Sequence, residues 1–163
     1  MSDQHDRRAA LPCAANRYLE HHVARLLVCF RHWTGRNLVE PSWSATAQAR
    51  ALFNAPYAVL SHDTAPDPIL NYANRTALQL FEVDWTELTA MPSRLTAEVP
   101  ERAERARLLS EVSSRGYIDD YRGIRVAKSG RRFLIERATV WNLFDESGVP
   151  YGQAATFSEW RHL

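Results

Sequence analysis

The chain has 163 residues, of which 45% are hydrophobic and 24% are charged. These values are typical of a globular domain rather than of a disordered or fibrous chain. The 20 Lys and Arg residues nearly balance the 19 Asp and Glu residues, and the formal net charge is +1. Such a chain has no long-range field that would attract nucleic acid or anionic lipid. We therefore expect one domain that binds neither nucleic acid nor a membrane.

The two cysteines, Cys13 and Cys29, have no CxxC spacing and are too few for a disulfide scaffold or a thiolate zinc site. The first eight residues are polar, and no apolar run approaches about 18 residues. We expect a cytoplasmic protein that is neither exported nor membrane-spanning.

The N-terminal third is predicted to be helical. Residues 1–12 are expected to form a disordered tail, and residues 13–54 a helical segment. Its first helix is predicted over residues 14–34 and ends at Gly35, and a second over residues 45–53 is capped by Ser44. The apolar residues of the first helix recur at steps of three and four; those expected to cover a sheet or to contact a dimer partner are Leu19, Val23, Leu26, Leu27, Phe30 and Trp33.

Residues 55–163 are predicted to form the main domain. Two short strands, 57–62 and 69–73, flank a turn rich in proline and aspartate. Asn74 is expected to cap a short helix, and Asp84 a single turn. A longer helix is predicted from residue 100 to residue 115, with Glu101 and Arg105 spaced for an ion pair. Three strands follow, at 117–127, 132–144 and 151–160, as an antiparallel meander.

This order of elements resembles that of a PAS domain and predicts an α+β fold, with a five-stranded antiparallel sheet and helices on one face. The resemblance to the PAS family implies that the first strand pairs with the last. By simple alternation, Phe133, Ile135, Thr139, Trp141 and Leu143 would point to one face, and Leu134, Ala138, Val140 and Phe144 to the other. Both faces would then be apolar, so the second also needs a cover. The amphipathic helix at 14–34 is the expected cover, within its own chain or across a dimer.

The stretch from Ala55 to Gln79, together with Met91-Pro-Ser-Arg-Leu-Thr and Gly130-Arg-Arg-Phe, resembles the bacterial stand-alone members of the MEKHLA family. That family is PAS-like and also occurs at the C-terminus of class III homeodomain leucine-zipper factors of plants, where it is thought to govern dimerisation. The resemblance covers residues 38–160. It implies a sensory or interaction role, and it supplies no ligand.

PAS domains commonly hold a small molecule between sheet and helices, so we compared the sequence with the requirements of known cofactors. The helix at 101–115 lacks the histidine that a haem would need, and residues 92–96 lack the cysteine of a flavin adduct. Cys13 and Cys29 precede the domain, which disfavours a covalent chromophore. The cofactor stays unknown, and a non-covalent ligand is compatible with the sequence.

Seven polar residues are candidates for lining such a cavity: Asn71, Tyr72, Arg94, Tyr121, Arg125, Asn142 and Gln153. For each of them, an ordinary structural hydrogen bond is the competing interpretation, and the one we favour. Gln153 lies on the last strand, where PAS domains often carry the residue that senses a ligand. For Asn74 we favour a structural role as a helix cap.

Enzymatic and metal-binding motifs are absent from the sequence. His62 and Asp63 are adjacent on a strand and diverge, as do Asp119 and Asp120, and His21 and His22 diverge on a helix. We expect no catalytic residue and no metal site.

The sequence therefore predicts a non-enzymatic sensory or interaction module. Because little chain follows Trp160, we expect it to signal as a homodimer or through a separate output protein. The alternative is a small enzyme that uses the cavity for acid-base chemistry on an apolar metabolite, with Glu136, His62 or Tyr121 as the general base. A third hypothesis is a homodimeric adaptor with a filled core.

Overall fold

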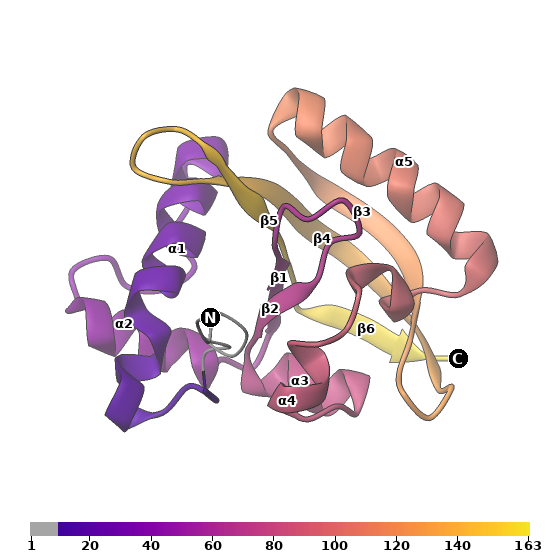
Figure 1. The fold of residues 1–163 in the computed structure, drawn as a ribbon, viewed down its shortest axis with the longest axis horizontal. Helices are drawn as coiled ribbons and strands as arrows, with labels where there is room; N and C mark the ends of the chain where they lie inside the picture. The colour runs from indigo at the N-terminus through magenta and orange to yellow at the C-terminus, as the bar shows by residue number, and fades with distance from the viewer. Residues whose placement is uncertain (1–9) are drawn as a thin grey trace, which may run out of the picture.

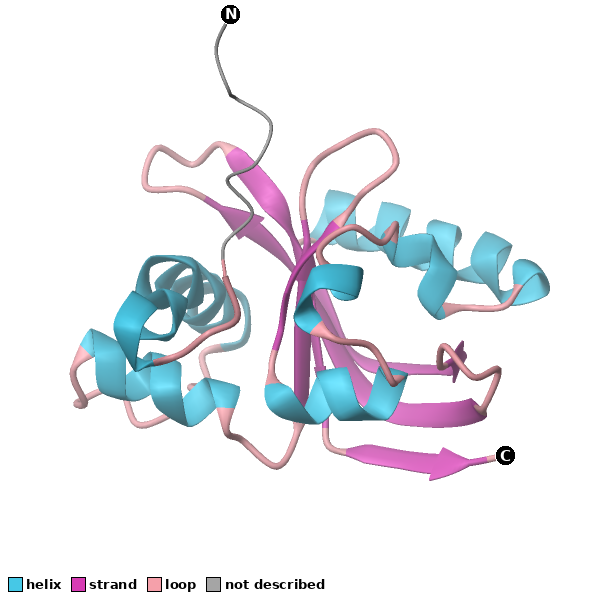
Figure 2. Ribbon diagram, turned by 60° about the horizontal axis from the view of Figure 1, so that its bottom comes forward, coloured by secondary structure: helices cyan, strands magenta, loops and turns pink. Residues whose placement is uncertain are grey.

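A computed structural model describes residues 10–163, apart from the side chains at positions 100 and 101. The predicted disordered tail falls mainly outside the described residues. An antiparallel sheet forms the middle layer of the molecule (Figures 1 and 2). The first two α-helices cover one face of the sheet, and the later helices lie on the other. The α+β fold expected from the sequence is confirmed.

The helical elements are the 3₁₀ turn η1 (Ala14–Leu19), α1 (Glu20–Thr34), α2 (Ala45–Phe53), α3 (Arg75–Phe81), α4 (Trp85–Leu88), the 3₁₀ turn η2 (Ser93–Thr96) and α5 (Val99–Arg115). The strands are β1 (Ala58–His62), β2 (Leu70–Ala73), β3 (Tyr117–Val126), β4 (Arg132–Phe144), β5 (Pro150–Phe157) and β6 (Glu159–His162).

The strand order is β2-β1-β5-β4-β3, and β6 continues beyond β5 along the first half of β4. The predicted pairing of the first strand with the last is confirmed, because β1 and β5 are antiparallel with Ala58 opposite Phe157 and Leu60 opposite Ala155. The predicted five strands become six, since the segment at 151–160 is interrupted at Ser158.

The single helix predicted over residues 14–34 is wrong in its first six residues. Arg17, Tyr18 and Leu19 have φ angles of 53°, 52° and 55°, in the left-handed region, and the α-helix begins only at Glu20. This bend is accompanied by a contact between the rings of Tyr18 and Phe53, whose centroids are 6.2 Å apart. The left-handed backbone places the Tyr18 ring against α2. The spacing of apolar residues predicts helices and strands, and it does not predict such a bend.

Helix α1 covers the second face of the sheet within its own chain. Val23, Leu26 and Phe30 are buried there. The indole of Trp141 on β4 donates a hydrogen bond to the Leu26 carbonyl at 3.2 Å and meets the Phe30 ring edge to face at 5.0 Å. Burial of each such side chain contributes about 1.5 to 3 kcal/mol before entropy, so α1 is part of the fold.

Two cores therefore lie on opposite faces of the sheet. The α1-side core includes Val23, Leu26, Phe30, Tyr72, Trp141 and Leu143. The α5-side core includes Leu70, Phe81, Val112, Phe133, Ile135 and Val140.

The predicted alternation along β4 is wrong at its midpoint. Phe133 and Ile135 lie in the α5-side core together with Val140, not in the α1-side core with Trp141. The cause is Arg137, whose φ of 51° interrupts the extended backbone, and the pairing with β3 shifts register at the same place. After a shift of one residue in the alternation, the side chains that follow point to the opposite face of the sheet.

Asn74 caps α3 as predicted, and it also joins three elements. Its Oδ1 accepts hydrogen bonds from the backbone N–H groups of Ala77 and Val59, at 3.1 and 3.0 Å. Its Nδ2 donates to the carbonyl oxygens of Leu52 at 3.0 Å and Tyr57 at 2.8 Å. The side chain is fully buried, so all of its hydrogen-bonding capacity is used inside the protein.

Helix α5 ends at Gly116 as predicted, with a φ of 100° that favours glycine. A Cβ atom at Gly116 would lie 2.5 Å from the ring of Trp33, so the end of α5 rests against the end of α1. The expected pair of Glu101 with Arg105 lies outside the described side chains. Arg105 itself lines the space beneath the helix.

Candidate functional site

A cavity of about 60 Å³ lies between α5 and the sheet. Strands β1, β3, β4 and β5 form its floor, and α5 closes it from above. Its walls are predominantly apolar, with contributions from Leu60, Leu70, Leu108, Val112, Ile118 and Val140. A polar group that is buried at these apolar walls needs a partner.

Tyr121 and Arg125 of β3 lie together at this cavity. The guanidinium of Arg125 donates to the Tyr121 hydroxyl at 2.7 Å and to the Ile124 carbonyl at 2.8 Å, and it stacks over the Tyr121 ring at 5.1 Å. Gly123 lies between them on the same strand face, and a Cβ atom there would overlap the Tyr121 hydroxyl. Because Gly123 has no side chain, the Tyr121 ring can lie along the strand and its hydroxyl can reach Arg125.

Arg105 is a cavity residue that the sequence interpretation missed. Burial lowers its pKa to about 10, and the charge of Arg125, which lines the same cavity, acts in the same direction. Among the side chains that the structure describes, neither has a carboxylate partner. The spacing from Arg105 to Leu109 and Val112, four and seven residues, could have placed it on the buried helix face.

His62 of β1 also lines the cavity. Its Nδ1 is 2.8 Å from the Asp63 carbonyl oxygen, and because a carbonyl has no proton, Nδ1 must carry the hydrogen. Its Nε2 is buried without a hydrogen-bond partner. Burial lowers the pKa of His62, although the bond to Asp63 and the side chain of Gln153 oppose this. In the tautomer that carries its hydrogen on Nδ1, Nε2 is an acceptor atom without a partner among the described residues.

Gln153 of β5 lies at the edge of the cavity and joins it to α5. Its Nε2 donates to the Leu109 carbonyl at 3.3 Å, the Ser113 hydroxyl at 3.1 Å and Oδ1 of Asn142 at 2.9 Å. Beyond this point an open groove borders the cavity, and His62, Leu109 and Gln153 line both spaces. These three residues form the boundary between the cavity and the exterior.

Asn142 of β4 lies in the groove rather than in the cavity. Its Nδ2 donates to the Val112 carbonyl on α5 at 2.8 Å. The backbone carbonyl oxygen of Asn142 accepts a hydrogen bond from the indole N–H of Trp33 on α1 at 3.0 Å. Asn142 therefore contacts Gln153, α5 and α1 at the same time.

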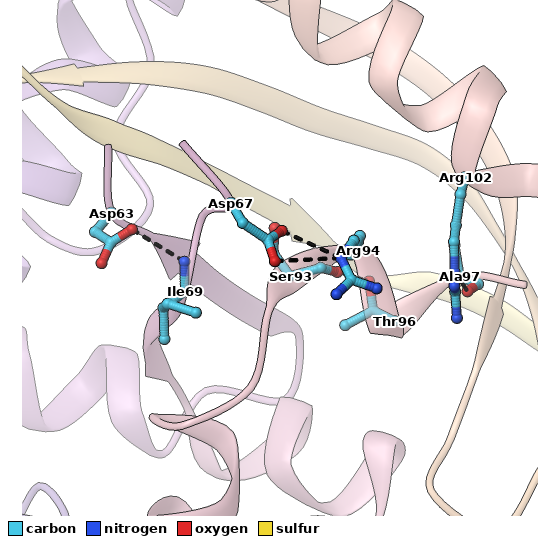
Figure 3. A network of polar contacts seen from close by, with 8 residues as sticks. All are labelled: Asp63, Asp67, Ile69, Ser93, Arg94, Thr96, Ala97 and Arg102. Atoms are coloured by element: carbon cyan, nitrogen blue, oxygen red, sulfur yellow. Dashed lines mark hydrogen bonds and ion pairs between the residues drawn. The ribbon is translucent and has the colours of Figure 1, made fainter. Parts of the chain in front are cut away.

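The structure does not bring the other three candidates to this site. Tyr72 is buried in the α1-side core, where its hydroxyl has no hydrogen-bond partner and burial raises its pKa. Arg94 is half exposed and forms an ion pair with Asp67 at 3.2 Å. Figure 3 shows this pair beside the turn in which Asp63 Oδ1 accepts a hydrogen bond from the N–H of Ile69.

Asn71 belongs to a polar network beneath α1. His22 Nδ1 is 2.9 Å from the Tyr151 hydroxyl, and its Nε2 is 2.9 Å from Ser61 Oγ. Ser61 Oγ donates to Asn71 Oδ1 at 2.6 Å, so it accepts from Nε2–H, and Nδ1 then accepts from the tyrosine. Burial lowers the pKa of His22 to about 4, which keeps the network neutral.

Only two of the three groups considered for acid-base chemistry line the cavity. Glu136 is outside the cavity and pairs with Arg122 at 3.1 Å, whereas His62 and Tyr121 line it. Among the side chains that the structure describes, no three from His, Cys, Asp or Glu gather as a metal site would require. Cys13 is exposed and Cys29 packs in the α1-side core. Neither can form a bond with a molecule in the cavity.

The fold is similar to those of solved PAS and light-oxygen-voltage domains. A PAS domain from Colwellia psychrerythraea matches with a TM-score of 0.58 and 18% identity, over 72% of this chain and 94% of that one. The light-state dimer of the fungal photoreceptor Vivid matches with 0.57 and 15%, over 84% and 93%. An RNA-binding light-oxygen-voltage receptor matches with 0.58 and 18%, over 74% of this chain and 33% of that one.

These identities establish a shared fold and nothing finer. The molecule is thus a PAS-like domain, the class that the sheet order and the cavity beneath α5 define. The model of the MEKHLA domain matches residues 20–162, and the chain belongs to that family. The match begins at the first residue of α1, so the helix that covers the sheet lies within it. No curated protein matches the chain in sequence.

Proposed function

We propose that this PAS-like domain is a non-enzymatic sensory module that binds a small molecule in the cavity between α5 and the sheet. The observation that carries the proposal is an apolar cavity lined by polar groups that have no carboxylate or hydrogen-bond donor as a counterpart among the described side chains. Arg105 and Arg125 bring positive charge to it, and His62 brings an unused acceptor. Native proteins seldom leave such groups unsatisfied, and a bound molecule would satisfy them.

The proposed route of the signal runs from the cavity to α1. A ligand that displaces Gln153 or α5 would disturb the hydrogen bonds that meet at Asn142, which also holds Trp33. Because Trp33 rests on Gly116 at the end of α5, a movement of α5 would be felt by α1. We propose that the change then leaves the domain by dimerisation or through a separate output protein.

The compartment that we propose is the cytoplasm. Cys13 and Cys29 are both free thiols, as expected in a reducing environment. No helix in residues 10–163 is long and apolar enough to cross a membrane.

Native mass spectrometry of protein purified from its own host tests the proposal, because it reports a bound molecule and the number of subunits together. Leu109→Trp would place an indole at the boundary of the cavity, and Val99→Trp, at an exposed position of the same helix, is the matched control. We expect a small molecule in the wild type and the control, and its loss from Leu109→Trp. A ligand-free wild-type monomer would contradict the proposal.

One observation favours an enzyme as the second candidate function. His62 lines the cavity with an Nε2 atom that has no hydrogen-bond partner, and such an atom can accept a proton from a bound molecule. Mass spectrometry of the same sample after incubation distinguishes the two candidates. A sensor returns its ligand unchanged, whereas an enzyme converts it and loses this activity in His62→Gln.

A further inference from the structure

We infer that the ligand of the cavity is a short-chain organic acid that also carries a hydroxyl group. Its carboxylate would pair with Arg105 and Arg125, and its hydroxyl would donate to His62. This inference rests on the proposed function, because it names the chemical class of the molecule that the cavity binds.

The charge of the ligand follows from the two guanidinium groups. Arg125 is only 7% exposed, and both of its hydrogen-bond acceptors, the Tyr121 hydroxyl and the Ile124 carbonyl, are neutral. Arg105, which is partly buried, lines the same cavity. Two like charges facing one apolar cavity are costly unless an anion lies between or beside them. A carboxylate fits this need, because guanidinium groups bind it through parallel N–H bonds.

The hydroxyl group follows from His62. The side chain is 8% exposed, and its Nδ1–H is occupied by the Asp63 carbonyl. The free Nε2 is therefore an acceptor and can be satisfied only by a donor. Arg105 lies close enough for its charge to oppose protonation of His62. The acceptor and the positive charge thus face the same small space, which suits one molecule that carries both a donor and an anion.

The size of the ligand follows from the cavity. A volume of about 60 Å³ has room for about four to six ordered waters and is well below the several hundred Å³ of pockets for drug-sized molecules. The surrounding side chains, such as Leu60, Val112 and Ile118, are apolar. These dimensions suit a short aliphatic chain. Inorganic phosphate would satisfy the arginines but leave the apolar walls without contact.

Isothermal titration calorimetry of the ligand-free full chain tests each part of the inference. Lactate and β-hydroxybutyrate carry both groups, propionate and butyrate lack the hydroxyl, and lactamide lacks the charge. We expect binding of the hydroxy acids to be at least about tenfold tighter than binding of either the plain acids or the amide, since each lost hydrogen bond leaves a buried group unpaired. Inorganic phosphate should bind more weakly than the hydroxy acids.

Variants assign the effect to named side chains. Arg105→Gln should weaken lactate binding at least about tenfold and leave lactamide binding unchanged. Arg107→Gln removes an exposed arginine from the same helix and is the matched control, with unchanged binding. In His62→Gln the preference for lactate over propionate should shrink. Tight binding of lactamide, or full lactate affinity in Arg105→Gln, would overturn the inference.

The failure of this inference can be told apart from the failure of the proposed function. Native mass spectrometry could find a neutral molecule that Leu109→Trp excludes, while calorimetry finds no binding of a hydroxy acid. This result would support the proposed sensory function and refute the inference that the ligand is a hydroxy acid. If host-purified protein carries no small molecule and none of the acids binds, both proposals fail.

Discussion

The imidazole of His22 should make the stability of this protein fall as the medium becomes acidic. In the folded protein His22 is buried between Tyr151 and Ser61, and its pKa is about 4 instead of the ordinary 6.5. Desolvation is the cause. Below pH 6.5 the unfolded chain therefore binds a proton that the folded chain refuses, and unfolding becomes easier.

The magnitude follows from the size of the pKa difference. At about 1.4 kcal/mol per pKa unit, the difference between 6.5 and about 4 corresponds to about 3 kcal/mol. This stability is fully present above pH 6.5, is lost progressively as the pH falls toward about 4, and changes no further below that value. His62 acts in the same direction, since its pKa is also lowered.

Urea unfolding at a series of pH values, for the wild type and His22→Gln, isolates the contribution of His22 because that of His62 cancels in the difference. His22→Gln should be less stable at neutral pH, where it loses the bonds to Tyr151 and Ser61. The gap should narrow by about 3 kcal/mol between neutral and acidic conditions. His21→Gln, which removes an exposed imidazole from the same helix, is the control. A gap for His22→Gln that is independent of pH would refute the reasoning.

Three further substitutions test the packing. Asn74→Asp replaces two buried N–H donors by a charged oxygen facing carbonyl groups, and should cost at least about 3 kcal/mol of unfolding free energy in urea titrations; near-wild-type stability would contradict the hydrogen-bond assignment. Gly116→Ala should cost about 1 to 3 kcal/mol and alter the near-ultraviolet circular dichroism of Trp33, and an unchanged spectrum would argue against their contact. Trp141→Phe removes the hydrogen bond to the Leu26 carbonyl and should lower the melting temperature, whereas an unchanged value would mean that this bond adds no stability.

The sequence predicts best where local chemistry decides the structure. Asn74 caps a helix because its side chain can accept backbone N–H bonds, and Gly116 ends one because it tolerates a positive φ. Both signals are visible in a few neighbouring residues. The same is true of the prolines and aspartates between β1 and β2. The order of the strands then follows from the family resemblance and is confirmed by the pairing of β1 with β5.

The errors arise where distant contacts decide. Arg17 and Arg137 adopt positive φ angles, which nothing in their own residue type favours, so the bend before α1 and the bulge in β4 could not be read locally. The cavity shows a middle case. His62 is in phase with Leu60 along β1, and Arg105 is in phase with Val112 along α5, so periodicity held the information. Charged residues and residues beside a turn usually lie at the surface, so residue type and periodicity point in opposite directions at these two positions.

The bulge at Arg137 has a consequence for comparing members of this family. An alignment that assumes strict alternation of side chains along the whole of β4 would assign one half of the strand to the wrong core. The two halves should be aligned separately, on Phe133 and Ile135 of the α5-side core and on Trp141 and Leu143 of the α1-side core. Three steps along β4, from Ile135 to Ala138, face two steps along β3, from Gly123 to Tyr121, so β4 carries one extra residue here. A relative without that residue would need a matching change in β3, and an insertion or deletion in both strands is therefore expected in an alignment.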